Sequence, residues 1–224
     1  MLLHALDATA DGASEIQIHS PDTDVFVLSP QRYADLCENT SFVTGKGSNH
    51  RVIKLRPIVQ ALGQAKTAAL PAFHAISGAD NTGSFSGKGK LVWWRIFQEA
   101  EEDVITELGR RGVNENPTAE TETAIEKLVC QLYFPKTTIT EVKELRWWLF
   151  RKKQAQSEGL PPTQAALHET ILRAHYQLIV WNNDRVPNPQ VPPPPKTMAG
   201  KERETNGYLC LLNYHQLLRH LSNL

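Results

Sequence analysis

The expected fold depends on the stretch Ser20-Pro21-Asp22-Thr23-Asp24-Val25-Phe26-Val27-Leu28. Its last four residues are apolar, which predicts a buried strand over 25–28. If this strand begins near Asp24, the carboxylates of Asp22 and Asp24 face one point at its edge, because residues i and i+2 of a strand point to the same side. Mg²⁺ or Mn²⁺ would neutralise their repulsion and prefers such oxygen ligands. A plain polar turn is the alternative, since Ser-Pro-Asp is ordinary turn chemistry.

Short strands and helices are expected to alternate up to residue 80. Strands are predicted over 15–18, 25–28, 41–43 and 51–55, and helices over 2–8, 30–38, 57–62 and 65–76. The third and fourth strands are expected to pair as a hairpin across a Gly-rich loop. Such alternation is typical of an α/β fold with a mostly parallel sheet, in which the site lies at the carboxyl ends of the strands.

Beyond residue 90 the strand patterns end and apolar residues recur at helical spacing. Three stripes carry this pattern: Ile125, Leu128, Val129 and Leu132; Val142, Leu145, Trp148 and Leu149; and Leu167, Ile171, Ala174 and Leu178. Capping boxes are predicted at Thr123 with Glu126 and at Thr138 with Glu141. The expected organisation is an α/β core over 1–98, a helical subdomain over 99–185, and a proline-rich linker and tail over 186–224.

A second polar stretch follows the mostly apolar segment 70–76 and reads Ser77-Gly78-Ala79-Asp80. Small residues around Asp80 let the backbone come close to whatever this side chain faces. The turn Gly87-Lys88-Gly89-Lys90 then leads into a predicted helix. Its backbone N–H groups and two lysines suit a phosphate, although a flexible surface turn is the commoner structure for such a sequence. It is not a P-loop, because Ser84-Phe85 stands where Lys and Ser or Thr are required.

The amino-acid composition limits which binding partners are expected. In 224 residues, Lys+Arg and Asp+Glu balance at 24 each, so nucleic-acid binding would need a local patch. Cys37, Cys130 and Cys210 lie far apart, which argues against a structural zinc site and a disulfide-linked partner and indicates a reducing, intracellular compartment, with the nucleus as one candidate. No apolar run approaches the roughly 18 residues of a membrane span, so no membrane partner is expected.

Asp22-Thr23-Asp24, the later Gly78-Ala79-Asp80 and the glycine-lysine turn together resemble the flap-endonuclease-like branch of the PIN-like nucleases. The resemblance implies a three-layer PIN-like core in which Asp22, Asp24 and Asp80 are catalytic carboxylates that bind Mg²⁺ or Mn²⁺. It implies that Gly87, Lys88, Gly89 and Lys90 belong to a helical hairpin that grips a nucleic-acid backbone, with DNA favoured over RNA. The reaction would be hydrolysis of a phosphodiester by two divalent ions.

A closer resemblance joins the stretches 20–28, 70–90 and 161–167 to uncharacterised animal proteins that look transposable-element-derived. Two departures stand out: the upstream acidic cluster of that group would precede Met1, and residue 81 is Asn where flap endonucleases usually carry an aromatic. We therefore expect an N-terminally truncated fragment with an incomplete metal site and weak or no activity. The alternative is a non-catalytic, domesticated module that binds nucleic acid or protein.

Other residues with reactive or stacking side chains are expected to be structural. His74 stands beside Phe73 in an apolar run and is interpreted as a packed core histidine rather than a base. The five tryptophans could stack on bases, but their helical spacing favours the core. A basic patch could touch nucleic acid, and a solvated helix end is the preferred interpretation; it contains Arg146, Arg151, Lys152 and Lys153.

Overall fold

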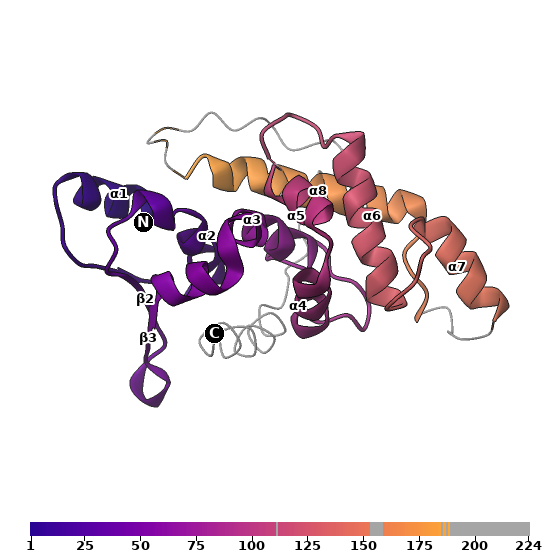
Figure 1. Cartoon of the computed structure of the whole chain (residues 1–224), viewed down its shortest axis with the longest axis horizontal. Helices are drawn as coiled ribbons and strands as arrows, with labels where there is room; N and C mark the ends of the chain where they lie inside the picture. The colour runs from indigo at the N-terminus through magenta and orange to yellow at the C-terminus, as the bar shows by residue number, and fades with distance from the viewer. Residues whose placement is uncertain (111, 153–158, 185, 187, 189–224) are drawn as a thin grey trace.

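The computed structural model describes every residue except 111, 153–158, 185, 187 and 189–224 (Figure 1). The elements in chain order are α1 (Leu2–Ala10), β1 (Ile16–His19), α2 (Thr23–Gln31), η1 (Tyr33–Asp35), β2 (Thr40–Thr44), η2 (Gly47–Asn49), β3 (Arg51–Lys54), α3 (Leu55–Ile76), α4 (Lys90–Glu99), α5 (Glu102–Gly109), α6 (Ala119–Tyr133), α7 (Val142–Arg151) and α8 (Gln164–Asn182). Most of the predicted linker and tail, 186–224, lies outside the described residues.

The fold is mixed α/β, with a small three-stranded sheet in the order β1-β2-β3. β1 and β2 are parallel, whereas β2 and β3 are antiparallel and form the hairpin predicted from the sequence. The central strand β2 is buried along both faces from Thr40 to Val43. Its Phe42 ring packs 5.0 Å from the ring of Phe26 on α2, which joins the sheet to the helix that follows β1.

The predicted strand over 25–28 is wrong, because this segment belongs to α2. The Asp22 carboxylate accepts the N–H of Asp24 at 2.8 Å and caps the helix. Phe26, Val27 and Leu28 are all buried, so the helix is apolar on several sides and its sequence lacks a polar stripe. An apolar run of this length does not distinguish a buried strand from a buried helix. The helix predicted over 30–38 is also wrong, since Pro30 lies in α2 and only the short turn η1 follows.

The long helix α3 joins the two helices that were predicted over 57–62 and 65–76. Gly63 interrupts it with φ 72° and ψ 170°, a backbone conformation that only glycine adopts without strain. The residues after this break, from Ala69 to Ile76, are buried. α3 therefore runs as two segments, and the second is the central helix of the molecule, in contact with α2, α5 and α8.

The second half is helical, as expected, and its three predicted stripes pack inward, with Trp148 partly buried. Neither predicted capping box forms. Thr118 caps α6 instead, since its hydroxyl accepts the N–H of Thr121 at 3.3 Å. Glu126 accepts the N–H of Val142 at 2.8 Å, so it satisfies the start of the neighbouring helix α7 rather than its own. Buried apolar residues from both halves form one continuous cluster.

The sheet and α1 lie at one end of the molecule and α7 at the other, with α8 running between them (Figure 1). Among the described residues, no helix is long and apolar enough to cross a membrane. Cys37 and Cys130 are free thiols, and burial raises the pKa of Cys130 to about 12.

Candidate functional site

The two aspartates of the opening stretch lie where β1 ends and α2 begins. The Ser20 N–H still bonds to Val43 O of the sheet, at 3.0 Å, and the Ser20 hydroxyl accepts the N–H of Asp22, also at 3.0 Å. Asp22 is thus the N-cap of α2, and Asp24 stands in its first turn, where the helix dipole favours a negative charge. The pair lies at the carboxyl end of β1, as expected, but on a helix N-terminus instead of a strand.

His74, in the last turn of α3, lies against Asp24. Its Nε2 is 2.9 Å from Asp24 Oδ1, and its side chain is only 1% exposed. Burial lowers the pKa of His74 well below its usual range, and the nearby Lys90 charge lowers it further. The imidazole is therefore neutral near pH 7, and the Asp24 carboxylate requires the ring proton to sit on Nε2, which donates the hydrogen bond.

Lys90, the first residue of α4, belongs to the same cluster of side chains. Its Nζ donates to His74 O at 3.0 Å and to Ser77 Oγ at 2.9 Å, and only 6% of the residue is exposed. A cation here suits the C-terminal carbonyls of α3. The expectation that Lys90 contacts a nucleic-acid backbone does not fit this burial, because its ammonium group points into the protein.

Trp181, from α8, completes the cluster. Its ring stacks on His74 with centroids 5.7 Å apart and planes 20° apart, and its side chain hydrogen-bonds to Asp24. Burial raises the pKa of Asp24, and the charge of Lys90 and the bond from Trp181 oppose that rise. We call Asp24, His74, Lys90 and Trp181 the inner cluster, since four helices each contribute one member.

Two contacts hold α8 in place over this cluster. Near the end of α8, the Asp184 carboxylate forms an ion pair with Arg32, at the end of α2, with Arg32 Nη2 3.0 Å from Asp184 Oδ1. Within α8, Gln177 Oε1 accepts a hydrogen bond from Asn81 Nδ2 at 3.4 Å, which connects the turn after α3 to α8. Arg32 is buried, so this pair is shielded from solvent and screened little by salt.

Asp80, the third predicted carboxylate, is exposed on the turn between α3 and α4. Gly78 has φ 109°, and Thr82 Oγ1 accepts the N–H of Ala79 and donates to Ala75 O, both at 2.7 Å, which fixes the turn. Burial is the main cause that raises the pKa of Asp22, and the charges of Asp24 and Asp80 raise it further. Asp24 and Asp80 thus both lie within electrostatic reach of Asp22.

The donors fit a hard divalent cation in kind, since all three are carboxylates and their mutual repulsion would be relieved by positive charge. They are not gathered into a finished coordination sphere: within the described part of the chain, no group of three or more His, Cys, Asp or Glu residues is arranged to hold a metal ion. A cation would have to draw the three carboxylates together.

The turn Gly87–Lys90 places its two lysines differently. Lys88 is half-buried, its Nζ lies 4.8 Å from the centre of the Tyr133 ring, and burial lowers its pKa. Gly89 is the N-cap of α4 and provides no side-chain cap. Lys88 is thus the cation of this turn that stands closer to solvent, whereas Lys90 is structural.

Comparisons of this chain with protein-family models, with curated proteins and with solved structures find no match. The assignment of the site therefore depends on the residues themselves. Sequence reasoning placed His74 in the core and did not connect it with Asp24, and it did not single out Trp181. The available signal for His74 was its position in the last apolar turn before Asp80, in the same stretch that carries the third carboxylate.

Proposed function

We propose that this chain is a metal-dependent, nuclease-like domain that hydrolyses phosphodiesters in nucleic acid, built on a PIN-like core. The observation that carries the proposal is the environment of Asp22: burial raises its pKa most, and the charges of Asp24 and of Asp80, which follows a different helix, raise it further. Acidic residues from distant stretches that converge at the carboxyl end of a strand are typical of sites that bind divalent ions. The parallel β1–β2 pair connected through α2 supports the PIN-like core.

In this proposal, Asp22, Asp24 and Asp80 would hold Mg²⁺ or Mn²⁺, and the ion would supply an activated water and a positive charge for the leaving oxygen. His74 holds the Asp24 carboxylate in place through its hydrogen bond to Oδ1, which would orient the carboxylate as a ligand. Lys88, beside the exposed turn, contacts the phosphate backbone. We expect slow hydrolysis, because the carboxylates are not gathered in advance.

The test is cleavage of labelled flap and single-stranded DNA in Mn²⁺, with matched RNA strands to establish the preference between DNA and RNA. We expect slow cleavage by the unaltered chain and loss of it in Asp24→Asn. Asp11→Asn, an exposed aspartate in the turn after α1, is the matched control and should cleave normally. Equal cleavage by Asp24→Asn and the unaltered chain would exclude this site.

A non-catalytic module that binds nucleic acid or protein is the second candidate. It is favoured by the lack, in the described residues, of a ready group of metal ligands. Calorimetric titration of Mn²⁺ separates the two candidates. The nuclease proposal requires binding that Asp80→Asn weakens, whereas the inert module would show no heat of binding that depends on Asp22, Asp24 or Asp80.

A further inference from the structure

Helix α7 has a buried face and an exposed aromatic face. Val142, Leu145 and Leu149 are buried against the rest of the molecule. Trp147 and Phe150 point outward and are 61% and 63% exposed. Together with Lys143 and Arg151 they follow the spacing i, i+4, i+7 and i+8, so the four side chains share one side of the helix. We call these four residues the outer face of α7.

The two rings on this face lie close together with nearly parallel planes. Trp147 and Phe150 stack with centroids 6.5 Å apart and planes 24° apart. The guanidinium group of Arg151 lies 5.8 Å from the centre of the Trp147 ring. Two adjacent exposed aromatic rings bordered by cations are uncommon on a protein surface unless the surface binds something.

The charge on α7 selects the partner. Lys143, Arg151 and the C-cap residue Lys152 are exposed cations, against two exposed acids, Glu144 and the N-cap residue Glu141. A positive surface with stacked aromatic rings is complementary to a strand that offers both phosphates and unpaired base faces. A duplex hides its base faces, and an acidic peptide provides charge without a regular series of flat rings. Single-stranded nucleic acid satisfies both features.

We propose that the outer face of α7 is a stacking platform for single-stranded nucleic acid. The proposal rests on the proposed function and specifies which form of nucleic acid the chain holds, and where. Trp147 and Phe150 stack on successive bases, while Lys143 and Arg151 contact the phosphates between them. Affinity for the strand then depends little on base identity, because every base has a flat face.

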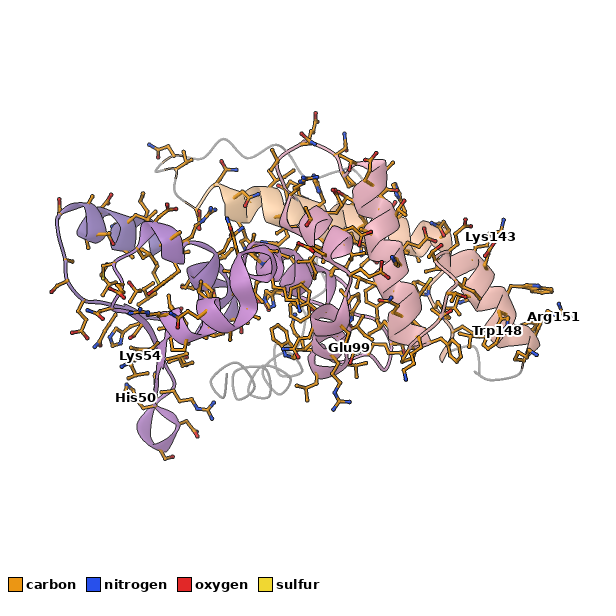
Figure 2. All side chains as sticks on the ribbon, viewed as in Figure 1. His50, Lys54, Glu99, Lys143, Trp148 and Arg151 are labelled. Atoms are coloured by element: carbon orange, nitrogen blue, oxygen red, sulfur yellow. The ribbon has the colours of Figure 1, made fainter. Side chains whose placement is uncertain are left out.

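Contacts connect this platform with the glycine-lysine turn. Trp148, the residue after Trp147, packs against Phe134 with ring centroids 5.0 Å apart and planes tilted by 46°. Phe134 follows Tyr133, whose ring lies under the Lys88 ammonium group at 4.8 Å. α7 therefore adjoins the end of α6 that contacts the turn. Figure 2 shows Lys143, Trp148 and Arg151 on α7, at the opposite end of the molecule from His50 and Lys54.

The experiment measures fluorescence anisotropy of two labelled strands, oligodeoxythymidylate and an abasic strand of equal length, with the full chain in EDTA. Stacking predicts tighter binding of the thymidylate strand. Trp147→Ala should weaken that binding about fivefold or more and leave the abasic strand unchanged, because only bases stack. Arg151→Ala should weaken both strands and lower the salt dependence by about 0.7 in slope, the contribution of one phosphate contact.

Three further measurements make the result decisive. Trp147→Phe should keep most of the affinity, and Val52→Ala, a change at another exposed apolar residue on β3, should keep all of it. Circular dichroism melting checks that each variant is folded. Unchanged thymidylate affinity in Trp147→Ala, an equal loss on both strands, or Trp147-dependent binding to phosphatidylserine vesicles without strand binding would each overturn the proposal. Because no cleavage is measured, failure of the nuclease proposal is seen separately.

Discussion

Around His74, an aromatic ring, a carboxylate and a lysine are packed together and joined by hydrogen bonds, although His74 Nδ1 is buried without a hydrogen-bond partner among the described residues; on α7, aromatic rings and cations are exposed to solvent. The inner cluster draws its members from α2, α3, α4 and α8, so its geometry depends on the whole tertiary structure. The outer face of α7 is produced by one helix and depends only on helical spacing. The comparison teaches that the same residue types stabilise the fold in one region and remain available to a partner in the other.

The largest expected effect separates the two lysines of the glycine-lysine turn. Lys90→Met removes the ammonium donor from His74 O and Ser77 Oγ and leaves His74 O with the longer, 3.3 Å bond from the Ser77 hydroxyl. We expect the free energy of unfolding to fall by about 3 kcal/mol, measured by urea denaturation. Lys88→Met is the matched control and should cost less than about 1 kcal/mol, since it loses a half-exposed cation–π contact. Equal losses in the two variants would show that the buried ammonium group of Lys90 stabilises the fold no more than that of Lys88.

The second prediction concerns pH and uses the lowered pKa of His74. The unfolded chain binds a proton on this ring below about pH 6.5, while the folded chain does not. The stability that comes from the neutral ring is therefore complete above the unfolded pKa and is lost as the pH falls below it, by about 1.4 kcal/mol per pH unit for one proton.

His74→Gln should flatten this slope between about pH 6.5 and 5, measured by urea denaturation in EDTA at several pH values. The raised pKa values of Asp22 and Asp24 act with the opposite sign at lower pH, since the folded state then favours their protonated forms. His4→Gln, at an exposed position on α1, is the control and should leave the slope unchanged. A slope that persists in His74→Gln would assign the linkage to another group.

The third prediction separates the two roles of Asp22. Asp22→Ala removes the N-cap of α2 and should lower the free energy of unfolding by about 1 kcal/mol. Asp22→Asn keeps the cap, because asparagine accepts the same bond from Asp24, and should fold as stably as the unaltered chain. Loss of Mn²⁺ affinity in Asp22→Asn, measured by calorimetry, would then report the carboxylate alone. Unchanged Mn²⁺ affinity would leave Asp22 with the capping role only.

Local patterns in the sequence were sufficient for much of the fold. The hairpin of β2 and β3 and the buried stripes on α6, α7 and α8 follow from the periods of two and 3.6 residues, which tertiary packing did not override. The segment 25–28 failed because α2 is buried on several sides, so its period is hidden. Asp22 after Pro21 was a helix-start signal that outweighed the apolar run.

The candidate site was only partly predictable. Asp22, Asp24 and Asp80 were selected from residue type, spacing and a family resemblance; the charges of Asp24 and Asp80 both act on Asp22, but a shared metal site stays a prediction. The contacts of His74 with Asp24 and Trp181 could not be derived from the sequence. They join residues from three helices, and the periodicity within one helix does not predict which residues of different helices come into contact. Lys90 was misjudged for the same reason: its sequence suggests an exposed turn, and its burial is a property of the packed molecule.

The smallest expected change in stability concerns the outer face of α7. Two tryptophan pairs, Trp93-Trp94 and Trp147-Trp148, look alike in the sequence, yet Trp93 and Trp94 are 1% exposed while Trp147 is 61% exposed. Trp147→Ala should change the free energy of unfolding by less than about 0.5 kcal/mol, because the side chain is already in water. Trp148→Ala at the neighbouring position should lower the free energy of unfolding by about 2 kcal/mol, because the Trp148 ring packs against Phe134.

Thermal and urea unfolding of the two single variants, side by side, check this last difference. A large loss of stability in Trp147→Ala would mean that its ring supports the fold, and the outer face of α7 would then lose its distinction from the inner cluster. A small loss, together with weaker binding of the thymidylate strand and unchanged binding of the abasic strand, would assign the ring to a partner, since a ring that acted only by positioning Arg151 would affect both strands.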